Sequence, residues 1–185
     1  MKVRFLKGLM VLIIFSCGVN ADEKSPELSL QDLRPLIGIW RGTGEGKWGR
    51  SSVERDFKII LDNNFLENHG RSVYPRQEKN RKGEIHETHD IFSYDTRRQT
   101  LVLRQFDNEG YATTYYADRS IGSPKKVVFV AEQMENLPDN WRARLTFHII
   151  DDTEYWESFE LDTAKGEYQL YLTNTFYRAR DPNTN

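Results

Sequence analysis

The stretch Gly38-Ile39-Trp40-Arg41-Gly42-Thr43-Gly44-Glu45-Gly46-Lys47-Trp48 decides the fold of this chain. From its first tryptophan onward, the even-numbered positions hold tryptophan, three glycines and tryptophan, and the odd-numbered positions are polar. Because successive side chains of a β-strand point to opposite faces, the stretch predicts a strand with its polar residues in solvent. Three glycines on the inner face indicate a sharp bend, or the close approach of another backbone or a ligand.

The rest of the chain repeats this alternation in short runs that are separated by turn residues, such as Asp62-Asn63-Asn64. Further strands are predicted over residues 53–61, 65–73, 84–94, 100–106, 111–118, 127–134, 142–150, 155–161 and 168–178. About ten strands joined mostly by tight turns are typical of an antiparallel up-and-down meander. Closure into a single all-β barrel covers the edges of such a sheet most simply. A two-sheet sandwich is the alternative, but it needs longer crossovers than the sequence offers.

The segment before the first strand predicts a helix and a signal peptide. Ser29 stands in capping position before leucines at helical spacing, so one short helix is expected over residues 29–36. Residues 1–21 combine a basic start, a short apolar stretch and small residues at their end, which is the pattern of a secretory signal peptide. We therefore expect residues 22–185 to form one β-barrel domain that is secreted or periplasmic.

The composition limits the partners of this domain. Cys17 is the one cysteine, so the mature domain cannot form an internal disulfide; a lipid anchor on Cys17 is an alternative to simple cleavage. The apolar stretch is too short for a comfortable membrane span. Loss of three basic residues with the signal peptide takes the formal net charge from −2 to −5. An acidic domain is a poor partner for nucleic acid, so none is expected.

Several short motifs carry a resemblance to known barrels. The pair Gly38 and Trp40 resembles the start of the first strand in the calycin superfamily, which includes lipocalins and fatty-acid-binding proteins. The longer run over residues 38–46 resembles the first strand of nitrobindin-type heme-binding barrels. The segments 71–75, 103–106 and 141–144 resemble a bacterial exported family of unknown function. The resemblance extends from about Leu30 to Arg178 and implies a closed antiparallel barrel.

The resemblance also implies roles for individual residues. In lipocalin-like barrels the first-strand tryptophan closes one end and a late basic residue stacks on it, which here correspond to Trp40 and Arg178. A ligand contact is the alternative role for Trp40. Nitrobindin-type barrels hold heme through a histidine of the last strand, and residues 168–178 contain none. No cofactor is therefore expected, and a heme or tetrapyrrole barrel remains an alternative.

The four histidines do not predict a metal site. His148 alternates with an apolar face and is expected to face solvent. His86 and His89 are three residues apart and therefore point to opposite faces of a regular strand. His69 belongs to a different strand. We expect no metal site.

Three charged residues share the apolar face of their strands: Arg55, Arg104 and Glu157. A buried charge is costly without a partner, so each must meet an opposite charge, water or a ligand. The planar guanidinium group of arginine matches a carboxylate bidentately. The position of these charges on the apolar faces of their strands therefore predicts a polar interior in which an arginine binds an anionic head group. Pairing of an arginine with Glu157 is the structural alternative.

These observations favour a barrel that binds a small hydrophobic or amphipathic ligand, anionic in the simplest case, with Arg55, Arg104, Glu157 and Trp40 as contacts. A second possibility is an envelope interaction scaffold that acts through the charged loop over residues 71–87. The sequence shows no nucleophile–base arrangement, no Gly-x-Ser-x-Gly elbow and no phosphate loop, so an enzyme is not favoured.

Overall fold

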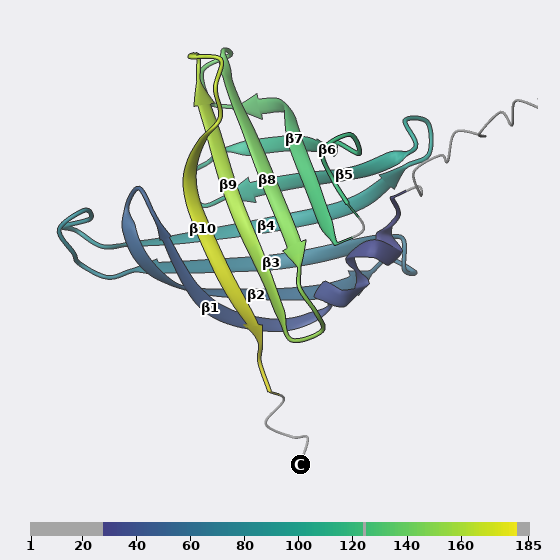
Figure 1. Ribbon diagram of the computed structural model, residues 1–185, viewed down its shortest axis with the longest axis horizontal. Coiled ribbons are helices and arrows are strands. Elements are labelled where there is room, and N and C mark those ends of the chain that lie inside the picture. Colours follow the sequence, from purple (N-terminus) through teal and green to yellow (C-terminus); the bar gives the residue numbers. More distant parts are fainter. Residues whose placement is uncertain (1–27, 124, 181–185) are drawn as a thin grey trace, which may run out of the picture.

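The computed structural model describes residues 28–123 and 125–180; the predicted signal peptide and Cys17 lie outside them. The chain forms a 3₁₀ helix and ten strands: η1 (Leu30–Leu36), β1 (Gly38–Gly46), β2 (Gly49–Ile60), β3 (Phe65–Tyr74), β4 (Glu84–Asp95), β5 (Thr100–Asp107), β6 (Ala112–Ala117), β7 (Lys126–Glu135), β8 (Trp141–Ile149), β9 (Glu154–Thr163) and β10 (Gln169–Arg178). Each strand pairs antiparallel with its neighbour in the chain, and β10 returns to pair with β1 (Figure 1). The predicted all-β barrel is confirmed, and the sandwich is excluded.

The glycines of β1 allow the barrel to close. Where β1 runs beside β10, a Cβ atom added to Gly42 would lie 1.8 Å from the carbonyl oxygen of Thr175. A Cβ atom on Gly46 would lie 2.4 Å from the carbonyl oxygen of Tyr171. Both clashes are with backbone atoms, which cannot swing aside. Beyond Trp40, the inner face of β1 therefore carries glycines, and at Gly42 and Gly46 the backbone of β10 approaches too closely for a side chain.

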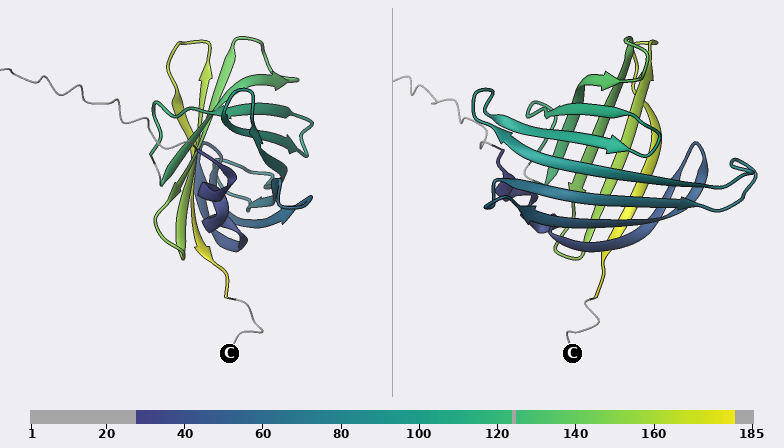
Figure 2. Two further views of the ribbon diagram at one scale, coloured as in Figure 1. Left: turned by 90° about the vertical axis from the view of Figure 1, so that its right-hand side faces the viewer. Right: turned by 180° about the vertical axis from the view of Figure 1, so that it is seen from behind.

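Helix η1 covers one end of the barrel. The hydroxyl group of Ser29 accepts a hydrogen bond from the backbone N–H of Gln31, and the Asp32 carboxylate accepts one from the backbone N–H of Ser29. This reciprocal capping fixes the start of the helix. Leu33 and Leu36 are fully buried in the barrel core. The helix lies on the opposite side from the β1–β2 and β3–β4 hairpins (Figure 1), and Figure 2 shows it from two further directions.

Next to η1, the interior is packed with aromatic rings. Trp40 meets Tyr155 edge-on with ring centroids 4.8 Å apart, and Tyr155 stacks on Phe176 at 4.7 Å. Phenylalanines from four further strands complete this aromatic core: Phe57, Phe92, Phe129 and Phe147. All of these rings are at most 1% exposed. Edge-to-face and offset contacts of this kind add to the stabilisation from burial.

The contact expected between Trp40 and Arg178 is present. The guanidinium carbon of Arg178 lies 4.2 Å from the centre of the indole ring. The same guanidinium group donates hydrogen bonds to the carbonyl oxygens of Ile37 and Pro35, both at 2.6 Å. The indole N–H of Trp40 donates to the carbonyl oxygen of Leu36 at 2.6 Å. Arg178 and Trp40 thus connect the last and first strands to the end of η1.

The charged segment over residues 71–87 consists of the ends of two strands and a short connection, as the strands predicted over 65–73 and 84–94 imply. Strands β3 and β4 remain paired as far as Tyr74 and Glu84, so only residues 75–83 connect them. An ion pair between Arg71 and Glu87, at 3.4 Å, lies within this strand pairing. Arg71 and Glu87 therefore belong to the outer face of the hairpin, whereas Arg76, Glu78, Lys79, Arg81 and Lys82 lie in the connection.

Within residues 28–123 and 125–180, no helix has both the length and the apolar character to span a bilayer. The one helix in these ranges is η1, with seven residues.

Candidate functional site

A cavity of about 520 Å³ occupies the end of the barrel opposite η1. Residues at or beside four hairpins line its mouth: Trp48, Glu84, Tyr111 and Leu137. About half of the lining residues are polar or charged, and an apolar wall is formed by residues of β7 to β10, which include Met134, Leu145, Phe159, Leu161 and Leu172. The barrel interior is therefore divided between a filled aromatic half and a hollow half.

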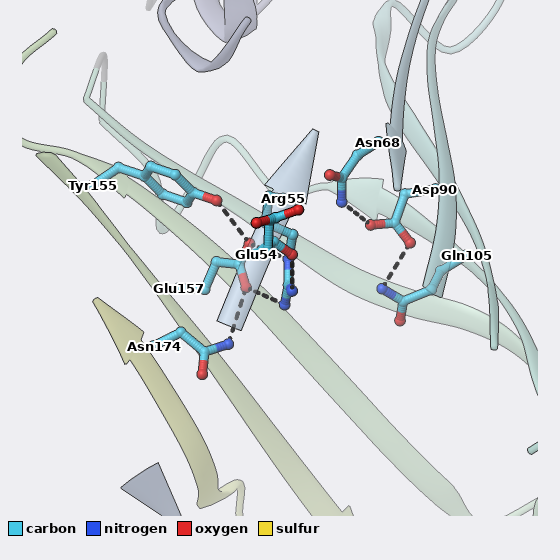
Figure 3. A network of polar contacts seen from close by, with 8 residues as sticks. All are labelled: Glu54, Arg55, Asn68, Asp90, Gln105, Tyr155, Glu157 and Asn174. Carbon is cyan, nitrogen blue, oxygen red and sulfur yellow. Dashed lines mark hydrogen bonds and ion pairs between the residues drawn. The ribbon is translucent and has the colours of Figure 1, made fainter. Parts of the chain in front are cut away.

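A buried ion pair lies between these two halves. Two guanidinium nitrogens of Arg55 donate to the two carboxylate oxygens of Glu157, at 3.2 and 2.9 Å (Figure 3). Tyr155 Oη and Asn174 Nδ2 donate to the same carboxylate at 3.2 and 3.1 Å. Arg55 is 9% exposed and Glu157 4%. Burial is the largest single influence on the Arg55 guanidinium and lowers its pKa, but the charge and hydrogen bond of Glu157, together with Tyr155 and Asp90, outweigh burial, so the pKa is raised overall.

Two of the three predicted interior charges, Arg55 and Glu157, therefore line the cavity, and they form the pair that the sequence left as an alternative. A bidentate, hydrogen-bonded pair satisfies a charge that would be very costly alone. The Glu157 carboxylate occupies the guanidinium face that an anionic ligand would need. This arrangement does not favour a carboxylate ligand on Arg55.

A third buried acidic or basic side chain, that of Asp90, has hydrogen bonds but no ion pair with any of the residues that the structure describes. It accepts hydrogen bonds from Asn68 Nδ2 at 2.7 Å and from Gln105 Nε2 at 3.0 Å (Figure 3). It is 2% exposed and lines the cavity. Burial raises the pKa of Asp90 to about 6, against the opposing effects of the Asn68 hydrogen bond and the Arg55 charge. The sequence could have predicted that Asp90 points inward, because Asp90 lies two residues before Phe92 on the same strand and therefore on the same, buried face.

Arg104 was predicted to point inward, and this prediction is wrong. Arg104 is exposed on the outer face of β5, where it donates to Ser93 Oγ at 3.1 Å. The prediction rested on the apolar neighbours Val102 and Phe106, which also lie outside the core cluster. The inward face of β5 carries Leu101 and Leu103 in the core, followed by Gln105 at the cavity.

Trp40 does not serve as a contact in this cavity. Its side chain is completely buried and lies in the aromatic core beside Tyr155, and it is absent from the cavity lining. Trp48, the second tryptophan of the same motif, lines the mouth instead. Its indole N–H donates to Tyr171 Oη at 2.7 Å. The tryptophan of the motif that lines the cavity is therefore the one beyond the end of β1.

The charged side chains around the cavity are mostly acidic. Besides the Arg55–Glu157 pair, the lining holds one lysine and four carboxylates: Lys47, Glu84, Asp90, Asp107 and Glu109. Lys47 lies at the mouth, near the rings of Trp48 and Tyr171. Burial raises the pKa of Glu109, and the nearby His86 partly offsets this rise. The field inside the cavity attracts cations and hydrogen-bond donors more than anions.

Two further polar atoms at the cavity have no hydrogen-bond partner among the residues that the structure describes. They are the hydroxyl oxygen of Thr88 and the side-chain carbonyl oxygen of Asn174, both buried. Glycine makes room for each of them, because a Cβ atom on Gly70 or Gly44 would lie 2.4 or 2.2 Å away respectively. Buried polar groups of native proteins are normally satisfied by protein or water, so these atoms are candidates for contact with a ligand or solvent.

The histidines separate as the strand parity predicts. His86 lines the cavity and lies 3.1 Å from Glu109, whereas His89 lies on the outer face beside His69. His148 contacts the exposed Trp156 and is absent from the cavity lining. Strand β10 contributes no histidine to the interior, as the sequence requires. The axial ligand expected for a nitrobindin-type heme site is therefore missing.

The comparisons with known proteins support the fold alone. No family model matches the chain, and no curated protein matches its sequence. Among solved structures, the chain is similar to Rv2717c from M. tuberculosis, with a TM-score of 0.62 and 18% identity over 82% of this chain and 97% of the other. It is also similar to an S-type phycobiliprotein lyase, CPES, from Guillardia theta, with a TM-score of 0.53 and 9% identity over 83% and 94% of the two chains. These matches agree with the closed ten-strand antiparallel topology and fit a calycin-like barrel fold.

Proposed function

We propose that this protein binds a small amphipathic molecule in the barrel cavity, with the apolar part of the ligand along the wall formed by β7 to β10 and its polar head at Asp90. The observation that carries the proposal is a buried carboxylate that has no ion-pair partner among the described residues and lies at the inner end of a cavity with one apolar wall. Ligand sites typically combine apolar walls with a few convergent polar groups in this way.

The charge distribution favours a head group that donates hydrogen bonds or carries a positive charge. Arg55 is already bound by Glu157, so an anionic head would meet Asp90 without a free guanidinium group to offset it. An ammonium or guanidinium head would instead pair with Asp90 and draw it into its charged form. Thr88 Oγ1 and Asn174 Oδ1 offer additional acceptors along the cavity wall. The anionic ligand expected from the sequence is therefore replaced by a cationic or donor-rich one.

A matched ligand series tests this proposal. Octylamine, octanol and octanoate have chains of equal length and differ in the charge of the head, and their affinities are measured by calorimetry at pH 5 and pH 8. We expect octylamine to bind tightest at pH 8 and to weaken at pH 5, where Asp90 is protonated. Asp90→Asn removes this preference, and Arg104→Leu on the outer face leaves it intact. Tighter binding of octanoate than of octylamine at pH 8 contradicts the proposed head group.

We also propose that the barrel acts outside the cytoplasm, because residues 1–21 have the pattern of a cleaved signal peptide. The test is the N-terminal sequence of the protein recovered from cell fractions. An N-terminus at Asp22 in a periplasmic or secreted fraction supports cleavage. An N-terminal, lipid-modified Cys17 supports an anchored form, and an intact N-terminus in the cytosol contradicts export.

A further inference from the structure

The outer face of the β3–β4 hairpin carries a cluster of three potential metal ligands, remote from the cavity. His69 and His89 are direct partners in the pairing of these two strands, and their rings stack with centroids 4.3 Å apart. Glu67 lies two residues before His69 and therefore on the same face of β3. Two imidazoles and one carboxylate thus meet on one surface.

The distances within this cluster match those between ligands of one metal ion. Glu67 Oε1 lies 2.8 Å from His89 Nε2 and 3.5 Å from His69 Nε2. All three ligand atoms lie within 4.8 Å of one another. In a tetrahedral site with bonds of about 2.0–2.1 Å, ligand atoms are about 3.3 Å apart. The observed values lie on both sides of this separation, so small side-chain rotations suffice to complete the site.

The backbone holds the three ligands in place. In the adjoining pair of the ladder, the interior residues Asn68 and Asp90 face each other, and their side chains are hydrogen-bonded at 2.7 Å. This buried contact fixes the register that aligns His69 with His89, because a slip of one residue would place Asp90 outside. The two strands are also flanked by β2 and β5 within the closed sheet. The ligands are therefore presented by a rigid surface.

We propose that Glu67, His69 and His89 bind a divalent transition-metal ion such as Zn²⁺, with water at the remaining coordination position. Imidazole nitrogen and one carboxylate oxygen suit zinc, nickel and copper better than magnesium or calcium, which prefer oxygen ligands. Asp56 lies opposite His69 on β2, but Lys58 Nζ holds its carboxylate at 2.5 Å. The donor set therefore consists of three protein ligands, as in zinc sites that keep one position open.

The experiment is a calorimetric titration of the purified, tag-free protein with zinc chloride. We expect saturable binding of one ion, weakened about tenfold or more by His69→Ala or His89→Ala, since even outer partners of a metal site typically contribute ten- to hundredfold. Glu67→Gln is the decisive variant, because its amide still accepts a hydrogen bond from His89 but is a poor metal ligand. We expect it to weaken zinc binding and to leave the melting temperature of the metal-free protein unchanged.

Two histidines outside the cluster provide matched controls. His148→Ala removes an outer-face histidine beside Trp156, and His86→Ala disrupts a second acidic group at the cavity mouth, formed with Glu84 and Glu109. We expect both variants to bind zinc as the unmodified protein does. Absence of saturable zinc binding, or its loss in His86→Ala with retention in His89→Ala, overturns the proposal.

Discussion

Replacement of Asp90 by asparagine removes the one buried carboxylate of the described cavity lining that has no ion-pair partner. Asparagine has nearly the same shape and resembles the protonated acid, but it does not titrate. Its amide still accepts one hydrogen bond, and its new N–H₂ group needs an acceptor. Asn68 can supply this acceptor by turning its amide, because Asn68 Oδ1 has no partner among the described residues. The substitution therefore isolates the charge of Asp90 from its packing.

The magnitude follows from the pKa of Asp90. Burial raises this pKa from 3.8 to about 6, a difference of about 2 pH units, and each pH unit is worth about 1.4 kcal/mol. Between these two values the unfolded chain has lost the proton of Asp90 while the folded protein retains it. The folded state then binds more protons, so the free energy of unfolding falls as the pH rises. Asp90 therefore destabilises the fold by about 3 kcal/mol at neutral pH relative to pH 3.8 or below.

The assay is urea denaturation of both proteins from pH 4 to pH 7.5. The free energy of unfolding of Asp90→Asn, minus that of the unmodified protein, is expected to increase by about 2.5 kcal/mol across this interval, with most of the change before pH 6.5. All other titrating groups are common to both proteins and cancel in the difference. A difference that stays flat, or that decreases with pH, refutes the assignment of Asp90 as a buried, unpaired carboxylate.

Three further predictions concern the stability of the barrel. Glu157→Gln leaves Arg55 buried without its counter-charge and is expected to cost about 3–5 kcal/mol in urea denaturation. The double variant Arg55→Met with Glu157→Leu is expected to recover most of this loss, because two apolar side chains replace the pair. Trp40→Ala is expected to cost about 3–5 kcal/mol in the same assay, through loss of a fully buried aromatic side chain. Gly42→Ala is expected to lower the melting temperature strongly, because its Cβ atom would lie 1.8 Å from a backbone oxygen of β10. Thr43→Ala on the outer face of the same strand is the control and is expected to change the melting temperature little.

Each of these predictions has a contradicting outcome. Equal stability of Glu157→Gln and the unmodified protein would mean that the ion pair contributes nothing to the fold. An unchanged stability of Trp40→Ala would contradict the stabilising role of Trp40 in the aromatic core next to η1. Similar effects of Gly42→Ala and Thr43→Ala would show that β10 does not approach β1 as closely as described.

The fold could be predicted because most strands of this barrel have one apolar face and end in recognisable turns. Arg55 alternates with Val53 and Phe57, both buried, so its inward direction followed from parity. The same reasoning failed for Arg104, because β5 carries apolar residues on both faces. The alternation of side chains along a strand thus identifies an interior charge only where the outer face of that strand is polar.

The partners of the interior charges could not be predicted from parity. Arg55 on β2 and Glu157 on β9 are separated in the sheet by β1 and β10. Their meeting depends on the stagger between strands and on the empty inner face of β1, which a list of strands does not determine. Asp90 was missed for a different reason. Its strand has exposed Ile85 on the opposite face, and this weakened the contrast between the two faces.

The glycine-lined seam between β1 and β10 also has a consequence for the order of folding. Every other pairing of the barrel joins strands that are consecutive in the chain, whereas this one joins its first and last strands. Pairings of high sequence separation form slowly, because the entropy of closing a long loop is lost before the contacts are gained. Until β10 arrives, β1 presents an open strand edge whose glycines offer no side-chain protection. During synthesis the chain is thus expected to remain open and prone to association until its last strand is complete.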